Sequence, residues 1–151
     1  YRELLSPHIK PLSQELFEWQ NADYIKNNAH PEHLNHETIT GSYVRSKSEE
    51  MIHMVLYKNK IPFRYECGLK LGDFTYYPDF TIRHPKTGET YYWEHFGKMD
   101  DADYSKNVFS KLQHYTSHGI VPTIQLITTY ETKNNPFTIN NAEKIVNDYF
   151  L

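Results

Sequence analysis

The 151-residue sequence predicts one α/β (α+β) domain with elements in the order α-β-β-β-α-β-α and a mixed central sheet flanked by helices. Hydrophobic residues recur at helical spacing, then alternate with polar residues from Phe63, and return to helical spacing after three consecutive segments that are typical of strands. Short turns separate these three segments, which is typical of an antiparallel meander. A later strand is reached across a helix, so we expect it to pair in parallel and the sheet to be mixed.

The first 40 residues differ in character from the rest of the chain. A short helix is predicted over residues 13–24, where Leu16 and Phe17 offer an apolar side, and the residues that follow it are typical of a loop. We therefore expect residues 1–40 to be an N-terminal extension of helix and loop. Residues 41–151 are expected to form the α/β domain on which it packs.

The next helix carries an acid on its apolar stripe. Ser46 or Ser48 is a suitable N-cap, because a hydroxyl can accept a hydrogen bond from a free N–H of the first turn. Ile52 and Leu56 define the stripe at helical spacing, and Glu49 lies three and seven residues before them. Glu49 is therefore expected on or beside the buried face of this helix.

The remaining elements follow from periodicity and from turn residues. Alternation of period two begins at Phe63, Gly72-Asp73 is typical of a tight hairpin turn, and Gly119 is typical of a helix end. The expected elements are strands at 63–71, 74–83 and 90–96, a helix at 101–117, a strand at 123–128 and a helix at 140–151.

Composition argues against several classes of protein. The single cysteine, Cys67, excludes an internal disulfide framework and favours a reducing, cytoplasmic location. No apolar run approaches the roughly 18 residues of a membrane helix, so no membrane partner is expected. A net charge of −3 argues against a generic polyanion-binding module, and none of the nine histidines has the spacing of a structural zinc site.

Two acids stand inside segments that otherwise have the composition of strands. Asp79 shares a strand face with Thr81, and Glu94 shares one with Phe96 on the next strand. Adjacent antiparallel strands can place these acids side by side, where like charges repel and burial is costly. A divalent metal would compensate both charges, and carboxylates are the hard oxygen ligands that Mg²⁺ uses. The alternative is that both acids point to solvent from an exposed face of the sheet.

The ordered set of Glu49 on a helix, Pro78-Asp79 on a strand and Glu94 on the next strand resembles the PD-(D/E)XK nuclease superfamily. The restriction-endonuclease-like core of that family has the order α-β-β-β-α-β, and the resemblance covers residues 42–130. It implies that Asp79 and Glu94 bind Mg²⁺ or Mn²⁺, with the main-chain carbonyl of His95 as a further ligand. It also implies that Glu49 completes or orients the site.

One position departs from the family pattern. Two residues after the glutamate the family has a lysine that positions or activates the attacking water, and this sequence has Phe96 there. Lys111 aligns with Tyr115 on the following helix, so we expect it to reach the sheet face that carries Glu94. Lys98 is the alternative, because it keeps the strand parity of Glu94. A third alternative is that neither lysine serves.

These residues favour a metal-dependent deoxyribonuclease in which Arg45 and Lys47 contact the DNA backbone. The alternatives are cleavage of RNA, and a catalytically inactive nucleic-acid-binding or interaction module on a nuclease-like fold. Cutting both strands of DNA would need two such sites, hence a homodimer or a fused or partner domain. Glu66, on the polar side of the first strand, is expected to be a surface acid, with an outer-shell role at the metal as the alternative.

Overall fold

The computed structural model describes residues 9–151, and helices and strands follow one another along this part of the chain. The N-terminal elements are α2 (Leu12–Asn21), the 3-10 helix η1 (Pro31–His33), β1 (His36–Glu37) and β2 (Tyr43–Val44). The later elements are α3 (Lys47–Lys58), β3 (Phe63–Tyr65), β4 (Leu69–Leu71), β5 (Phe74–Tyr76), β6 (Phe80–Arg83), β7 (Thr90–Phe96), α4 (Ala102–Ser117), β8 (Leu126–Tyr130) and α5 (Ile139–Phe150).

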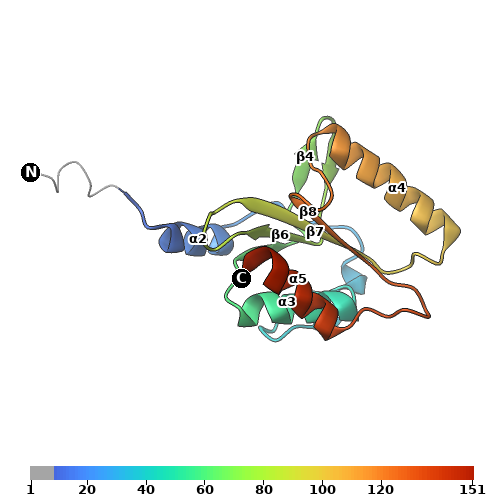
Figure 1. Ribbon diagram of the computed structural model, residues 1–151, viewed down its shortest axis with the longest axis horizontal. Helices are drawn as coiled ribbons and strands as arrows, with labels where there is room; N and C mark the ends of the chain where they lie inside the picture. Colours follow the sequence, from blue (N-terminus) through green and yellow to red (C-terminus); the bar gives the residue numbers. More distant parts are fainter. Residues whose placement is uncertain (1–8) are drawn as a thin grey trace, which may run out of the picture.

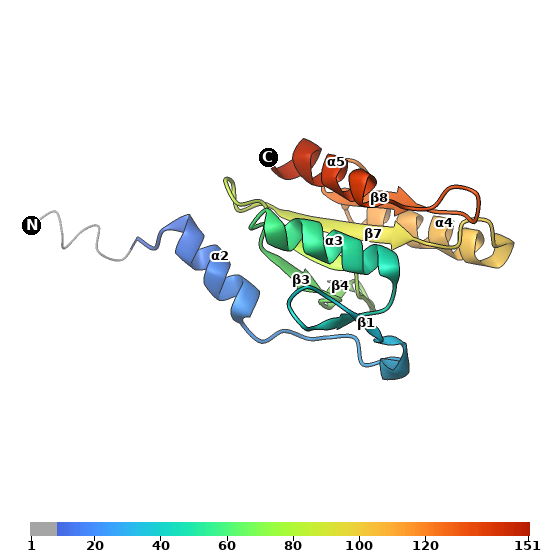
Figure 2. The same cartoon turned by 90° about the horizontal axis from the view of Figure 1, so that it is seen from below.

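A four-stranded mixed sheet lies at the centre of this arrangement (Figure 1). Its strand order is β3-β6-β7-β8, with antiparallel pairing as far as β7 and parallel pairing of β7 with β8. Helices α3 and α5 lie side by side on one face, as Figure 2 shows, and α4 lies on the other. The predicted mixed α/β fold with flanking helices is therefore confirmed.

The main helices begin where the sequence supplies a capping side chain. The Ser46 hydroxyl accepts the N–H of Glu49 at the start of α3, and the Asp101 carboxylate accepts the N–H of Tyr104 at the start of α4. Thr138 begins α5 with a capping box. No helix within residues 9–151 is long and apolar enough to cross a membrane.

Two apolar clusters hold the helices on the two faces of the sheet. On one face, α3 and α5 pack on the strands around Phe80, Trp93 and Val146, which are fully buried. On the other face, α4 packs around Tyr115 and Leu126 together with the β4–β5 hairpin. Because each Å² of buried apolar surface contributes roughly 25 cal/mol, these clusters provide most of the stabilisation that fixes the helices.

Two strands that the sequence predicts as continuous are each broken in two. The strand predicted at 63–71 stops after Tyr65, because Glu66 adopts a left-handed backbone conformation with φ of 48°. The strand predicted at 74–83 is interrupted at Pro78, which lacks the N–H that a continuous ladder would use. As a consequence β4 and β5 leave the main sheet and pair with each other. The prediction of two unbroken strands is wrong.

The last two strands of the sheet agree with the sequence to different degrees. β7 spans the predicted residues 90–96. β8 begins at Leu126, later than predicted, because Thr123 has a φ of 70° and its N–H donates to the carbonyl of Leu126 in a turn. The polar contacts of this turn replace the ladder that a strand from residue 123 would need.

The N-terminal segment covers the outer edge of β3. The N–H of Phe63 donates to Oε1 of Gln20 (2.9 Å), and the Tyr24 hydroxyl donates to the carbonyl of Tyr65 (3.0 Å). The Arg64 guanidinium also donates to a main-chain carbonyl at the end of α2. Because an open strand edge invites pairing with other chains, these contacts protect the sheet on this side.

Candidate active site

Three carboxylates lie at the end of the sheet where β6 begins and β7 ends. Phe80 pairs with Trp93 across these strands, so the preceding residue, Asp79, lies opposite Glu94. Glu49 reaches the same region from the first turn of α3, and its charge acts on Asp79. The structure therefore brings together the three acids that the sequence singles out.

Each of these carboxylates has one oxygen held by a hydrogen-bond donor of the protein. Two of the donors are phenols and one is a peptide N–H, and all three contacts are short. The donor and acceptor pairs are His95 N–H to Asp79 Oδ2 (2.7 Å), the Tyr115 hydroxyl to Glu94 Oε2 (2.7 Å) and the Tyr65 hydroxyl to Glu49 Oε1 (2.5 Å).

The second oxygen of each carboxylate is free. Oδ1 of Asp79, Oε1 of Glu94 and Oε2 of Glu49 have no hydrogen-bond partner among residues 9–151. They are also not sealed from solvent, because the buried side-chain atoms without a partner in the described part of the chain are Nδ1 of His53 and Oγ1 of Thr81. Three oxygens that can bind a ligand therefore remain at one end of the sheet.

Burial and neighbouring charges raise the pKa of two of the acids. Burial, together with the charges of Glu49 and Glu94, raises the pKa of Asp79 well above its usual value of 3.8. Burial also raises the pKa of Glu49, and the nearby Glu66 carboxylate adds to this effect. A cation bound among these groups would stabilise their ionised forms, so the site favours a positively charged ligand.

Lys111 supplies one positive charge to this group of acids. Its Nζ lies 2.5 Å from Oε2 of Glu94, and the Lys111 side chain is 28% exposed whereas that of Glu94 is 3% exposed. Burial acts to lower the pKa of Lys111, but the Glu94 carboxylate outweighs burial and the pKa is raised. Lys98 is exposed in the turn after β7, and Phe96 is buried against the ring of Tyr130. The cation nearest the acids is therefore Lys111.

A second cation of this region, Arg45, makes contacts that stabilise the fold. Nε of Arg45 donates to Oε2 of Glu66 (2.7 Å), and its other nitrogens donate to the carbonyls of His30 (2.7 Å) and Ala29 (2.6 Å). These contacts leave Arg45 few donors for DNA, whereas Lys47 is exposed at the first position of α3. Glu66 is 6% exposed, so the prediction of a surface acid is wrong: beyond the break in the strand it turns inward to Arg45.

The ring and the main chain of His95 face different parts of the molecule. The Nδ1 atom lies 2.8 Å from the Thr129 hydroxyl, and Nε2 lies 2.8 Å from Oε1 of Glu131. The ring therefore packs away from the acids, against Phe137. The N–H of His95 faces Asp79, and because the N–H and C=O of a strand residue point to the same side, its carbonyl faces the acids too.

The donor set at the sheet end suits a hard divalent cation. Free carboxylate oxygens and a main-chain carbonyl are ligands that Mg²⁺ accepts, usually together with several waters. The acids do not form a closed cage. Within residues 9–151, three ligand atoms of His, Cys, Asp or Glu lie within 4.8 Å of one another only at His30, Glu32 and His33, which are exposed at η1 and its N-cap. A cation at the sheet end would therefore keep part of its hydration.

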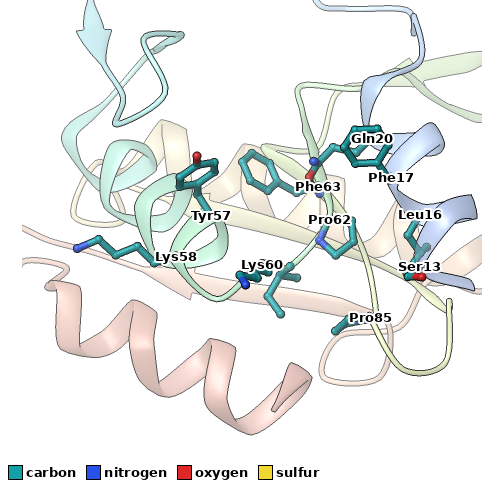
Figure 3. A pocket seen from close by; sticks show the side chains of 11 residues that line it. Ser13, Leu16, Phe17, Gln20, Tyr57, Lys58, Lys60, Pro62, Phe63 and Pro85 are labelled. Carbon is teal, nitrogen blue, oxygen red and sulfur yellow. Dashed lines mark hydrogen bonds between the residues drawn. The ribbon is translucent and has the colours of Figure 1, made fainter.

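A groove elsewhere in the molecule has a different character. It has a volume of about 520 Å³ and lies between α2 and the C-terminal end of α3, where Leu16, Phe17 and Pro62 line it (Figure 3). Among the residues that the structure describes, no acid lines this groove, and Glu49 lies at the opposite end of α3. Because this groove offers no carboxylate ligand among the described residues, the end of the sheet is the better candidate for metal-dependent chemistry.

Comparisons with models of protein families, with curated proteins and with solved structures found no match. Three acids with one free oxygen each, and a lysine in contact with one of them, form an arrangement that can bind a divalent cation and an anionic substrate together.

Two residues of the site were not predicted as such. The sequence places Tyr65 and Tyr115 on the apolar sides of a strand and a helix, where aromatic residues usually serve as packing. The structure shows that both rings are packed and that both hydroxyls bind glutamates. The helical spacing that identified Lys111 also places Tyr115, four residues later, on the same face of the helix. The sequence therefore contained a signal for Tyr115.

Proposed function

We propose that this protein is a metal-dependent nuclease with a restriction-endonuclease-like core that hydrolyses phosphodiester bonds of DNA. The observation that carries the proposal is the contact of Lys111 with Glu94 at the group of acids. The PD-(D/E)XK pattern has a lysine two residues after the glutamate, and this chain has the apolar Phe96 there. The ammonium group of Lys111 would supply the positive charge that Phe96 cannot supply.

In this proposal the acids hold the metal with the oxygens that the protein leaves free. Asp79 and Glu94 would bind Mg²⁺ or Mn²⁺ through Oδ1 and Oε1, with the carbonyl of His95 as a further ligand. Glu49, whose Oε2 is free, would complete or orient the metal site from α3. A bound metal would supply Lewis-acid chemistry, which neutralises charge on the scissile phosphate and lowers the pKa of a water.

Lys111 acts in this proposal on the negative charge that develops at the phosphate. Its raised pKa keeps the ammonium group charged at neutral pH, and its partial exposure leaves it accessible to a substrate. A fixed positive charge in a partly buried site stabilises developing negative charge more effectively than water does. Lys47, exposed at the start of α3, would contact the DNA backbone.

The direct test measures cleavage by Asp79→Asn and Glu94→Gln variants. Each change keeps the shape of the side chain and removes its charge, and we expect cleavage of supercoiled plasmid in Mn²⁺ to be abolished. Glu89→Gln is the matched control, because Glu89 is an exposed acid in the turn before β7. Cleavage that survives both Asp79→Asn and Glu94→Gln would overturn the site. A parallel panel of plasmid, single-stranded DNA and RNA distinguishes DNA from RNA cleavage.

Phe96 at the lysine position favours a second candidate function, a catalytically inactive nucleic-acid-binding or interaction module. Calorimetry with Mn²⁺ separates the two candidates. The enzyme is expected to bind Mn²⁺ and to lose that binding in Asp79→Asn. The inactive module is expected to bind nucleic acid or a protein without binding Mn²⁺.

A further inference from the structure

Tyr65 and Tyr115 come from opposite sides of the sheet and make the same kind of contact. Tyr65 lies at the end of β3 and donates its hydroxyl to Oε1 of Glu49, whereas Tyr115 lies on α4 and donates to Oε2 of Glu94. In each case the glutamate keeps its other oxygen free among residues 9–151. The arrangement therefore occupies one oxygen of each carboxylate and leaves the other oxygen available to a ligand.

A second donor strengthens the selection at both glutamates. The main-chain N–H of Arg45 also donates to Oε1 of Glu49 (3.2 Å), the oxygen that Tyr65 holds. The ammonium group of Lys111 contacts Oε2 of Glu94, the oxygen that Tyr115 holds. Two donors on one oxygen restrict rotation of the carboxylate, and they leave the opposite oxygen as the atom available to a ligand.

We propose that Tyr115 and Tyr65 are positioning residues that fix which oxygen of Glu94 and of Glu49 is presented to the metal. The inference rests on the proposed function, because it concerns the same site. Groups that hold metal ligands in place typically contribute a factor of about 10–100 to metal affinity. Packing alone does not require the hydroxyls, since a phenylalanine ring would fill the same space.

The phenols are suited to this task because they remain donors. Burial and the neighbouring Glu94 carboxylate raise the pKa of Tyr115, and burial and Glu49 raise that of Tyr65. Both hydroxyls are therefore protonated at neutral pH and can donate the hydrogen bonds that the structure shows. Neither phenol contacts the free oxygens, so each acts through the glutamate rather than on a substrate.

The test compares Mn²⁺ binding by wild type, Tyr115→Phe and Tyr65→Phe, measured by calorimetry. We expect Tyr115→Phe to raise the dissociation constant by about 10-fold or more, with a change in the same direction in Tyr65→Phe. The concentration of Mn²⁺ that gives half-maximal cleavage is expected to rise in parallel. Tyr149→Phe is the matched control, because its hydroxyl donates to the carbonyl of Thr123, away from the acids.

Each outcome decides the inference. Folded Tyr115→Phe and Tyr65→Phe variants with lowered thermal midpoints but with Mn²⁺ dissociation constants within about twofold of wild type would overturn it, since they would show a packing role alone. If one variant does not fold, the other decides. A wild type that binds no Mn²⁺ removes the proposed function and this inference together. If the wild type binds Mn²⁺ and cleaves DNA, and the Tyr→Phe variants bind Mn²⁺ equally well, the positioning role is overturned and the proposed function stands.

Discussion

Two cation–carboxylate pairs lie near the same end of the sheet, and they differ in what surrounds the cation. Arg45 binds Glu66 and, in addition, two main-chain carbonyls of the N-terminal segment, so its donors meet fixed acceptors. Lys111 has one carboxylate in contact, Glu94, and stands near a second acid, Asp79. The first pair is complete within the protein, whereas the second belongs to a group in which acids outnumber cations.

This difference distinguishes an ion pair that stabilises the fold from an ion pair that belongs to a functional site. A buried cation with several fixed acceptors connects segments that are distant in the chain, and the gain is structural. A cation among an excess of carboxylates leaves negative charge that a divalent metal would neutralise. Burial raises the pKa of Asp79, and the charges of Glu49 and Glu94, which belong to that excess, raise it further. The comparison therefore predicts opposite consequences when each cation is removed.

Removal of Lys111 is expected to have the largest effect, a loss of cleavage in a protein that still folds, although Glu94 also loses its cation. Loss of one preorganised charge at a reaction centre typically lowers the rate by roughly 10²–10³-fold. We expect Lys111→Met to show that loss in initial rates on supercoiled plasmid in Mn²⁺, with the circular dichroism spectrum unchanged. Lys106→Met, an exposed lysine of the same helix, is the control and keeps its rate. A fully active Lys111→Met would transfer the lysine role elsewhere.

Removal of Arg45 is expected to act on stability. The change leaves the buried Glu66 without its cation and two carbonyls without donors, and breaking such a pair costs about 3 kcal/mol. We expect Arg45→Met to lower the free energy of unfolding by that amount in urea titrations, while cleavage at low temperature persists. Lys86→Met changes an exposed charge and serves as the control. A stable but inactive Arg45→Met would place Arg45 in the site instead.

Asp79 differs from Glu66 and Glu94, because its direct contact is a peptide N–H rather than a cation. Its pKa is raised in the folded state, so its stabilising contribution is complete below its unfolded value near 3.8 and is lost as pH rises through the folded value. In EDTA, Asp79→Asn should therefore be more stable than wild type, by about 0.5–2 kcal/mol at alkaline pH. This difference in the free energy of unfolding between Asp79→Asn and wild type should narrow toward acidic pH.

Thermal unfolding at several pH values, with EDTA or Mn²⁺, measures this effect. Addition of Mn²⁺ should raise the midpoint of the wild type and leave that of Asp79→Asn unchanged, since ligands that bind the folded state stabilise it. A wild type that is more stable than Asp79→Asn at alkaline pH without metal would contradict the picture of an acid without a compensating charge.

Periodicity in the sequence predicted the parts of the fold that depend on local pattern. β7 is rich in aromatic residues, which favour strands, and was predicted over its full length. Glu49 lies with the buried residues of α3, as its spacing indicates. The break at Glu66 was missed, because a left-handed residue depends on contacts across the fold. Pro78 is typical of a strand edge or bulge, but the departure of a separate hairpin there was not predicted. Asp79 still lies opposite Glu94, since pairing continues up to the break.

The polar partners of the acids were harder to predict for the same reason. Arg45 and Glu66 are separated by 21 residues, and no local pattern links them. Tyr65 has the parity of a packing residue, which it is, and its hydroxyl role depends on the helix that crosses it. Lys111 was predictable because the helical repeat fixes which side chains share a face, and the sheet lies on that face.

Lys98 gives the smallest expected effect and the finest test of the comparison. Strand parity kept it as an alternative to Lys111, but β7 ends at Phe96, and Lys98 lies exposed in the turn that follows. An exposed lysine without a fixed acceptor can contribute only a screened contact to a phosphate, so Lys98→Ala should change the plasmid cleavage rate by less than about threefold. Its effect should shrink further with added salt, because screening weakens exposed charges first. A loss comparable to that of Lys111→Met would mean that the turn closes over the acids when DNA binds, and that both lysines act there.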